Sequence, residues 1–256
     1  MNRINQLFET KSENILSIYF TAGHPELSNI AELIQLLEES GVDMIEIGMP
    51  FSDPLADGPV IQQSSQKALA NGMNIHLLFE QLKDIRKTVK IPLLLMGYLN
   101  PVMHFGVEKF CAECKKAGVD GVILPDLPME EYEASYKKVF EENGLRFIFL
   151  ISPQTSEARI HKIDSLSNGF IYMVSSSATT GATGSLSEAQ LAYFNKVKSL
   201  KLKNPLVVGF GISNRENYLE VCKYANGAII GSAFVRMLEK PGDWTVNTRE
   251  FIKSIQ

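Results

Sequence analysis

The sequence predicts an α/β fold: a closed (β/α)₈ TIM barrel, forming a single domain over residues 1–256 with an extra N-terminal helix. Three observations lead to this prediction. The chain has 256 residues, near the usual size of one such barrel. Eight short apolar segments rich in β-branched residues alternate with segments of helical period. A closed ring of parallel strands also leaves no unpaired strand edge, unlike an open doubly wound sheet.

The strands are expected where apolar residues run together without polar alternation. They are residues 15–20, 42–47, 93–97, 119–124, 146–151, 170–174, 206–209 and 227–230. Continuous apolar strands are typical of a parallel sheet whose outer face is covered by helices. In a barrel of this kind, the loops that follow the strands carry the chemistry.

The helices are expected where apolar residues recur three and four positions apart. They are residues 30–39, 60–70, 77–89, 107–117, 130–142, 157–166, 187–200 and 216–223, with residues 245–255 completing the ring. Gly41 follows the first of them as a typical C-cap. Ahead of the first strand, Ile4, Leu7 and Phe8 have the spacing of a short amphipathic helix.

The composition narrows the class of protein. The formal net charge is −4 and no long run of Lys or Arg occurs, which disfavours binding to nucleic acid or to an anionic membrane. The strongest apolar run, residues 91–96, is too short to span a bilayer. The N-terminus lacks the apolar stretch of a signal peptide. We therefore expect a cytoplasmic globular protein.

The cysteines and histidines give no sign of a metal or disulfide site. The chain has three cysteines, an odd number that argues against a disulfide framework. Cys111 and Cys114 form one C-x-x-C within a helical segment, and we interpret them as small residues facing the sheet. The four histidines have no ligand spacing, so no bound metal is expected.

Glu46 is an ionisable residue near the end of the otherwise apolar second strand. We expect it to point into the mouth of the barrel, where loss of water raises the pKa of a carboxyl into the range of a general acid or base. Pairing with an internal cation is the alternative, but no predicted strand carries a Lys or Arg near its carboxyl end. The same absence argues against a Schiff-base aldolase, and the lack of a His cluster argues against a metal-dependent one.

The loop after that strand, PFSDPLADGP at residues 50–59, is rich in proline and contains Asp53 and Asp57. Prolines preorganise a loop, and Asp57 would fall back toward the barrel mouth. However, Asp-Pro and Asp-Gly pairs also form rigid surface turns, and either aspartate could cap the next helix. Spacing alone leaves these alternatives open.

Glycine-rich turns follow the last two predicted strands, GFG at residues 209–211 and GS at residues 231–232. Two such turns, each opening a helix, can cradle a phosphate with backbone N–H groups. As a dinucleotide signature the first is weak, because Asn214 stands where a third glycine belongs. Plain turn glycines are the alternative to a phosphate site.

The loop at residues 175–185 is small, polar and long enough to be a lid over such a site. Tyr172 and Phe210 could supply flat walls for an aromatic substrate, although aromatic residues also occur simply as core.

Several segments resemble the tryptophan synthase α subunit family. The most specific is EIGMPFSDPLADGP at residues 46–59, which resembles the family signature. The likeness continues in YFTAGHP at residues 19–25, GYLNP at 97–101, PDLP at 125–128, GFGIS at 209–213 and GSA at 231–233. It covers nearly the whole chain in order.

This resemblance implies a carbon–carbon lyase that cleaves indole-3-glycerol phosphate to indole and D-glyceraldehyde 3-phosphate, in L-tryptophan biosynthesis. It makes Glu46 the acid–base group at indole C3 and the glycerol hydroxyl, and Asp57 the acceptor of the indole N–H. Tyr172 would lie near the reacting carbons, and Thr180 would meet Asp57 when the lid closes. The remaining matches to the phosphate and indole sites are Gly181, Phe210, Gly211, Gly231 and Ser232.

The resemblance also implies a partner, a pyridoxal-phosphate-dependent β subunit that receives indole through a channel in an α2β2 complex. Pyridoxal phosphate belongs to that subunit, so no cofactor is expected in this chain. Residues 50–53 and the loop at residues 100–101 would face the partner.

Two departures from the family pattern affect the expected activity. Residues 176–178 read Ser-Ser-Ala where the family commonly has Arg, a small residue and Gly, and His24 stands where it often has Asp. Loss of the cation would loosen lid closure or move the anion contact elsewhere. Ser176 therefore favours one alternative, a catalytically weak α-like subunit that mainly activates a β partner, whereas Glu46 and Asp57 argue against it. Another phosphate-binding barrel enzyme would need a Lys or Cys pair that no strand end supplies.

Overall fold

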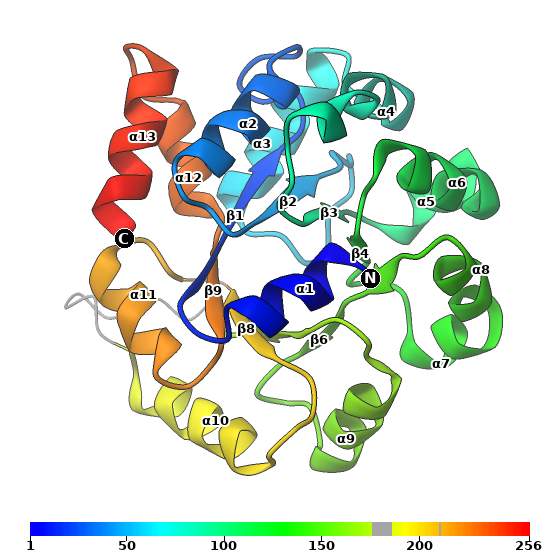
Figure 1. Ribbon diagram of the computed structural model, residues 1–256, viewed down its shortest axis with the longest axis vertical. Helices are drawn as coiled ribbons and strands as arrows, with labels where there is room; N and C mark the ends of the chain where they lie inside the picture. Colours follow the sequence, from blue (N-terminus) through cyan, green and yellow to red (C-terminus); the bar gives the residue numbers. More distant parts are fainter. Residues whose placement is uncertain (176–185, 210) are drawn as a thin grey trace.

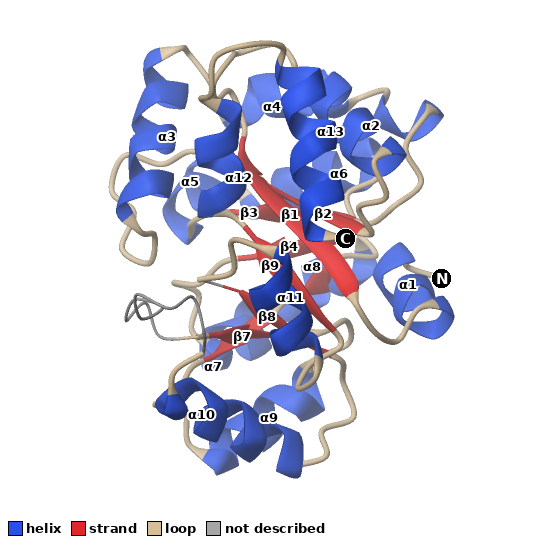
Figure 2. Cartoon of the chain, turned by 90° about the vertical axis from the view of Figure 1, so that its left-hand side faces the viewer, coloured by secondary structure: helices blue, strands red, loops and turns tan. Residues whose placement is uncertain are grey.

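The computed structural model describes residues 1–175, 186–209 and 211–256 (Figure 1). Within them the strands form one parallel sheet that curves into a barrel, with the helices packed around it (Figure 2). The strands are β1 Ile15–Thr21, β2 Met44–Gly48, β3 Leu93–Met96, β4 Gly121–Ile123, β5 Arg146–Phe147, β6 Phe149–Ile151, β7 Ile171–Val174, β8 Leu206–Gly209 and β9 Gly227–Ile230. Hydrogen bonds join them in the order β5-β4-β3-β2-β1-β9-β8-β7-β6.

The two ends of this sheet, β5 and β6, are one strand divided at Ile148. β5 pairs with β4 and β6 pairs with β7, and between them the N–H of Ile148 donates to the carbonyl oxygen of Val122 at 3.0 Å. The sheet therefore closes through a single strand. The predicted barrel is confirmed, and the fifth predicted strand changes partners halfway along its length.

The helices are α1 Arg3–Thr10, α2 Ile30–Glu39, α3 Pro59–Ala70, α4 Ile75–Leu82, α5 Leu99–Phe105, α6 Val107–Ala117, α7 Met129–Glu131, α8 Lys137–Glu142, α9 Glu157–Leu166, α10 Glu188–Ser199, α11 Arg215–Cys222, α12 Ser232–Leu238 and α13 Trp244–Ile255. Two of them, α5 and α12, were not predicted. Each has seven residues, too few to display a helical period.

Two predicted helices are wrong in part. The helix expected over residues 77–89 ends at Leu82 and is followed by a 3₁₀ turn at Ile85–Lys87. There Arg86 donates to the carbonyls of Gly118 and Ile91 and pairs with Asp120 at 2.6 Å, so tertiary contacts override the periodicity. The helix expected over residues 130–142 is interrupted by a π-helical turn at Tyr132–Tyr136, in which the Tyr132 ring stacks on Phe147.

Side chains along each strand point alternately into and out of the barrel, so the core has two layers. The inward-facing side chains fill the barrel, and those facing outward pack against the helices, as the barrel architecture requires. The inner layer comprises Tyr19, Met44, Leu94, Met96, Ile123, Ile148, Phe170, Tyr172, Val207 and Ile229, together with Ile4 from α1. The α1 helix lies across the amino-terminal end of the barrel (Figure 1), where the ring of Phe8 is 5.9 Å from that of Phe170. The open end is therefore the one at which the strands finish.

No helix within the three described stretches is long and apolar enough to cross a membrane.

Candidate active site

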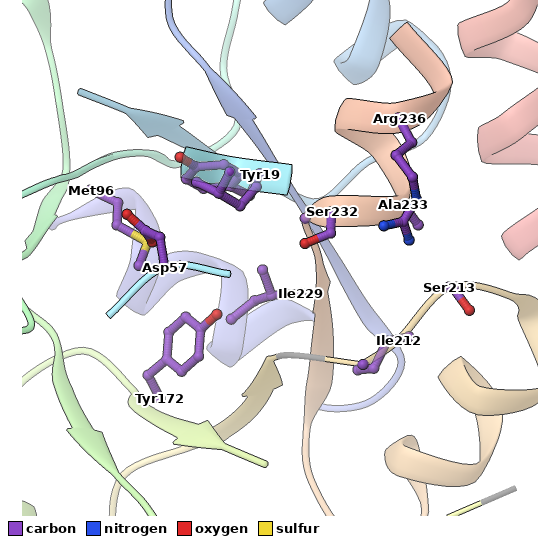
Figure 3. Close-up of a pocket in the computed structure, with 13 residues that line it drawn as sticks. Tyr19, Asp57, Met96, Tyr172, Ile212, Ser213, Ile229, Ser232, Ala233 and Arg236 are labelled. Carbon is purple, nitrogen blue, oxygen red and sulfur yellow. The ribbon is translucent and has the colours of Figure 1, made fainter. Parts of the chain in front are cut away.

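A cavity of about 200 Å³ opens at the carboxyl ends of the strands (Figure 3). Its walls come from β1, β3, β7 and β9, from the loops after β2 and β8, and from the first turns of α3 and α12. The lining residues are Tyr19, Asp57, Ile61, Met96, Tyr172, Gly211, Ile212, Ser213, Ile229, Gly231, Ser232, Ala233 and Arg236. The fold thus brings Asp57, Tyr172, Gly211, Gly231 and Ser232, all candidates from the sequence, to one cavity.

Tyr19 and Tyr172 form part of the cavity wall because glycines leave room for their rings. A β-carbon at Gly48, the last residue of β2, would lie 2.1 Å from the hydroxyl oxygen of Tyr19. A β-carbon at Gly209, the last residue of β8, would lie 2.0 Å from the hydroxyl oxygen of Tyr172. Both distances are far below van der Waals contact, so a larger residue at either strand end would displace the tyrosine beside it.

Asp57 is held by a tyrosine that sequence reasoning missed. The hydroxyl of Tyr98 donates to Oδ2 of Asp57 at 2.9 Å and accepts from the backbone N–H of Ala56 at 3.0 Å. Burial raises the pKa of Asp57, and the hydrogen bond from Tyr98 opposes that shift.

The helix-cap alternative for the two aspartates is wrong. The N-cap of α3 is Gly58, and no side chain caps it. The carboxylate of Asp53 instead accepts from Ser52 on the exposed part of the loop. Asp57 therefore serves the cavity and not the helix end.

Glu46 is fully buried in β2, as expected, but its carboxyl group does not line the cavity. Oε1 accepts from Ser17 Oγ at 3.3 Å, and Oε2 has no hydrogen-bond partner in the described part of the chain. Ser17 lies two residues nearer the amino end of β1 than Tyr19, so the carboxyl points deeper into the barrel. The expectation that Glu46 points into the mouth is therefore wrong, because Ser17 offers a partner below it.

Burial dominates the electrostatics of Glu46. Desolvation raises the pKa of Glu46 to about 8, and the hydrogen bond from Ser17 opposes the shift. No cation pairs with this carboxyl group among the described residues. Burial is the main cause of the raised pKa of the Tyr19 and Tyr172 hydroxyls, and the charge of Glu46 raises it further. A carboxyl of this kind holds its proton at neutral pH and can donate it.

The two glycine turns meet at the cavity wall next to α12. Gly211 has a φ of +78°, a backbone conformation that favours glycine. Gly231 precedes α12, and Ser232 is the first residue of that helix. The hydroxyl-bearing residues Ser213 and Ser232 line the same wall. The two glycine turns predicted to cradle a phosphate thus lie on one wall of the cavity, and phosphate binding there stays a prediction.

Three candidates from the sequence, Thr180, Gly181 and Phe210, lie outside the described residues, as does most of the predicted lid.

Cys111 and Cys114 are buried on α6, as interpreted from the sequence, and burial raises the pKa of Cys111 to about 12. Within the described stretches no group of three or more His, Cys, Asp and Glu side chains is arranged to hold a metal ion.

Three further residues at the site escaped the sequence analysis. Ser17 carried a usable signal, since it is a polar residue inside an apolar strand, like Glu46 in the next strand. Tyr98 follows the third strand directly, yet nothing in the sequence pairs it with Asp57. Arg236 lies on α12, a helix too short to be recognised.

A parallel (β/α)₈ barrel with a cavity at the carboxyl ends of its strands has the architecture of the (β/α)₈-barrel enzymes. Comparison with known proteins gives the family. Residues 6–254 match the family model described as tryptophan synthase alpha chain. The tryptophan synthase alpha chain of Christiangramia forsetii is 56% identical over 256 residues, covering 100% of this chain and 99% of the relative. This chain therefore belongs to the tryptophan synthase alpha chain family.

Other relatives and solved structures are also similar to this chain along nearly its whole length. The alpha chain of Flavobacterium johnsoniae is 54% identical over 256 residues and is matched along 100% of both chains. The crystal structure of the alpha chain from Legionella pneumophila has a TM-score of 0.88 at 35% identity, covering 100% of this chain and 96% of that one. A tryptophan synthase complex from Pyrococcus furiosus has a TM-score of 0.85 at 33% identity, covering 95% of this chain and 98% of that one.

Proposed function

We propose that this chain is a carbon–carbon lyase that cleaves indole-3-glycerol phosphate to indole and D-glyceraldehyde 3-phosphate, the α reaction of tryptophan synthase. Glu46 is its general acid and base, and Asp57 accepts the indole N–H. The observation that carries this assignment is the buried Glu46 carboxyl, whose pKa of about 8 keeps a transferable proton beside the cavity at neutral pH.

The reaction needs one proton donated and one removed. Glu46 gives its proton to C3 of the indole ring, which leaves a positive charge shared with the ring nitrogen. It then takes the proton from the hydroxyl next to the breaking bond. As the C3–C1′ bond breaks, its electron pair returns to the ring and the hydroxyl carbon becomes the aldehyde. Glu46 ends the cycle protonated, so no cofactor in this chain is required.

Asp57 supports the charged intermediate. The indole N–H becomes a stronger donor as the ring turns positive, so its hydrogen bond to the carboxylate is strongest in the transition state. A charge-assisted hydrogen bond of this kind contributes about 1.5–3 kcal/mol. Tyr98, through its 2.9 Å bond to Oδ2, fixes the direction in which the carboxylate points.

Glu46 must turn upward before it can act. Its carboxyl is tied to the barrel interior only by the 3.3 Å hydrogen bond from Ser17, while Oε2 has no partner among the described residues. Rotation about the side-chain torsions therefore breaks a single long hydrogen bond. In the cavity, the carboxyl can exchange that bond for contact with the substrate.

A surface groove supports the partner that the family implies, a pyridoxal-phosphate-dependent β subunit in an α2β2 complex. Residues 50–52 and 100–101, both expected to face the partner, line one groove of about 590 Å³. Leu55 follows residues 50–52 in the same loop, and Met103 lies on α5 between the groove residues Pro101 and His104. Their side chains are 89% and 56% exposed. The groove and these side chains would be covered by the partner.

The test is indole release from indole-3-glycerol phosphate by the wild-type chain and by Glu46→Gln, each with and without a β subunit. Glutamine keeps the shape of the side chain but cannot donate and recover a proton. We expect release by the wild type and a loss of about a hundredfold or more in the variant. If the wild type releases no indole yet still activates the β subunit on added indole, the chain is an activating subunit and the lyase proposal fails.

A further inference from the structure

Arg236 is the only Lys, Arg or His among the described residues that line the cavity. It lies on α12, one turn after Ala233, and its side chain runs back toward the start of the helix (Figure 3). Asp57 lies on the other side of the cavity in the same view (Figure 3). The cavity therefore has an acidic side and a basic side.

No structural role accounts for this guanidinium. It makes no hydrogen bond or ion pair with any residue in the ranges 1–175, 186–209 and 211–256, and it is exposed. Glu239, three residues further on, is the acid best placed to pair with it along the chain. That carboxylate instead pairs with Lys67 at 2.5 Å and approaches His24 at 3.3 Å, so it is already engaged.

A phosphate group bound beside α12 would need a cation to balance its charge. A phosphate monoester carries a charge of about −1.5 to −2 at neutral pH, and the carboxylate of Asp57 in the same cavity repels it. The hydroxyls of Ser213 and Ser232 and the backbone at Gly211 and Gly231 can donate hydrogen bonds but carry no formal charge. Arginine presents a planar fork of donors that matches phosphate oxygens.

We infer that Arg236 binds the phosphate group of the substrate and thereby sets its orientation, with the phosphate toward α12 and the ring nitrogen toward Asp57. This inference rests on the proposed function, since it concerns the same substrate. Arg236 touches the phosphate and none of the atoms whose bonds change. It therefore acts mainly on substrate binding, and on turnover only through orientation.

The experiment compares Arg236→Gln with the wild type and with Lys240→Gln, a cation four residues further on that does not line the cavity. Each is assayed for KM and kcat with indole-3-glycerol phosphate and for inhibition by inorganic phosphate. For Arg236→Gln we expect both KM and the phosphate inhibition constant to rise about tenfold, with kcat changed by less than about threefold. The tenfold change corresponds to the lower end of the range for a charged hydrogen bond, and we expect the lower end because Arg236 is solvent-exposed.

One further variant and one change of conditions test the inference further. Arg236→Lys keeps the charge without the fork and should recover part of the phosphate affinity. Raising the salt concentration should narrow the difference between Arg236→Gln and the wild type. Lys240→Gln should match the wild type throughout.

Unchanged KM and phosphate inhibition in Arg236→Gln would overturn the inference. So would a fall in kcat or in unfolding temperature without any change in phosphate inhibition, because that pattern marks a structural role. A wild type that releases no indole contradicts the proposed function instead. In that case phosphate binding, measured by calorimetry on the wild type and Arg236→Gln, still decides whether Arg236 holds the anion.

Discussion

The hydroxyl of Ser17 on β1 donates a 3.3 Å hydrogen bond to Oε1 of Glu46 on β2, at a depth in the barrel below the cavity wall. This bond is the main influence that opposes the effect of burial on the pKa of Glu46. It also holds the carboxyl away from the cavity. Ser17 therefore adjusts both the acidity and the position of the proposed general acid.

Ser17→Ala should raise the pKa of Glu46 above its present value of about 8. Removing a hydrogen bond that favours the charged form leaves burial unopposed, so the protonated form persists to higher pH. If Glu46 acts as an acid, activity falls as pH rises through its pKa. The descending limb of the profile of kcat/KM against pH should then move to higher pH in the variant.

Ser254→Ala, at an exposed position of α13 remote from the cavity, is the control for this profile. Its descending limb should coincide with that of the wild type. A limb that stays in place in Ser17→Ala would show that the observed ionisation belongs to another group.

The barrel could be predicted from the sequence because its strands are continuous apolar runs separated by helical periods. Strand partners and helix ends that depend on contacts between distant residues could not be predicted. The division of the fifth strand at Ile148 depends on which neighbour each half meets, and α4 ends at Leu82 because Arg86 turns toward Gly118. A strand or helix pattern in one segment carries no information about such partners.

The same limit applies to the site. Glu46 was recognisable as an ionisable residue in an apolar strand, and its raised pKa follows from burial. The depth of its carboxyl depends on Ser17, a residue on another strand. Spacing left the role of Asp57 open, whereas the hydrogen bond from Tyr98 places its carboxylate at the cavity. That the whole of residues 1–256 forms one domain stays a prediction.

Tyr98→Phe should lower kcat/KM by about tenfold or more, since it removes a hydrogen bond to a charged group. The hydroxyl joins Asp57 to the backbone N–H of Ala56, so its loss frees the carboxylate to rotate and raises the pKa of Asp57 further. The measurement is steady-state cleavage of indole-3-glycerol phosphate near neutral pH.

A double-mutant cycle separates this effect from general damage. In an Asp57→Asn background, Tyr98→Phe should lower kcat/KM much less than it does in the wild type, because both residues act through the same carboxylate. Additive losses would mean that Tyr98 acts independently of Asp57.

Leu55→Asp should weaken binding of a β subunit by about tenfold or more while leaving the isolated chain folded. Leu55 is 89% exposed, so the substitution disturbs no core contact, whereas in a complex it would bury an unpaired charge. Titrating the variant against a β subunit and following activation gives the affinity. Leu219→Asp is the matched control, because Leu219 is also an exposed leucine, at 41%. It belongs to α11, which contributes no residue to the groove, whereas the loop that carries Leu55 contributes residues 50–52. Equal affinities for the two variants would argue against this face as the docking surface.

The buried carboxyl of Glu46 should make stability fall with pH between about 4.5 and 8, the ordinary and the folded-state pKa of this group. In that window the folded chain keeps the proton and the unfolded chain has lost it. The folded state binds more protons there, so the free energy of unfolding decreases as pH rises. Below the window both states are protonated and the group contributes no penalty.

Glu46→Gln removes this ionisation and keeps a neutral side chain of the same shape. The variant should therefore differ little from the wild type near pH 4.5 and be more stable by on the order of a few kcal/mol near pH 8. Urea denaturation at both pH values, fitted with a common slope, measures the difference. A variant less stable than the wild type at pH 8 would mean that the carboxylate is satisfied in the folded chain, and that its pKa is not raised. The same titration of stability would then remove the physical basis for Glu46 as a general acid, independently of any assay of indole release.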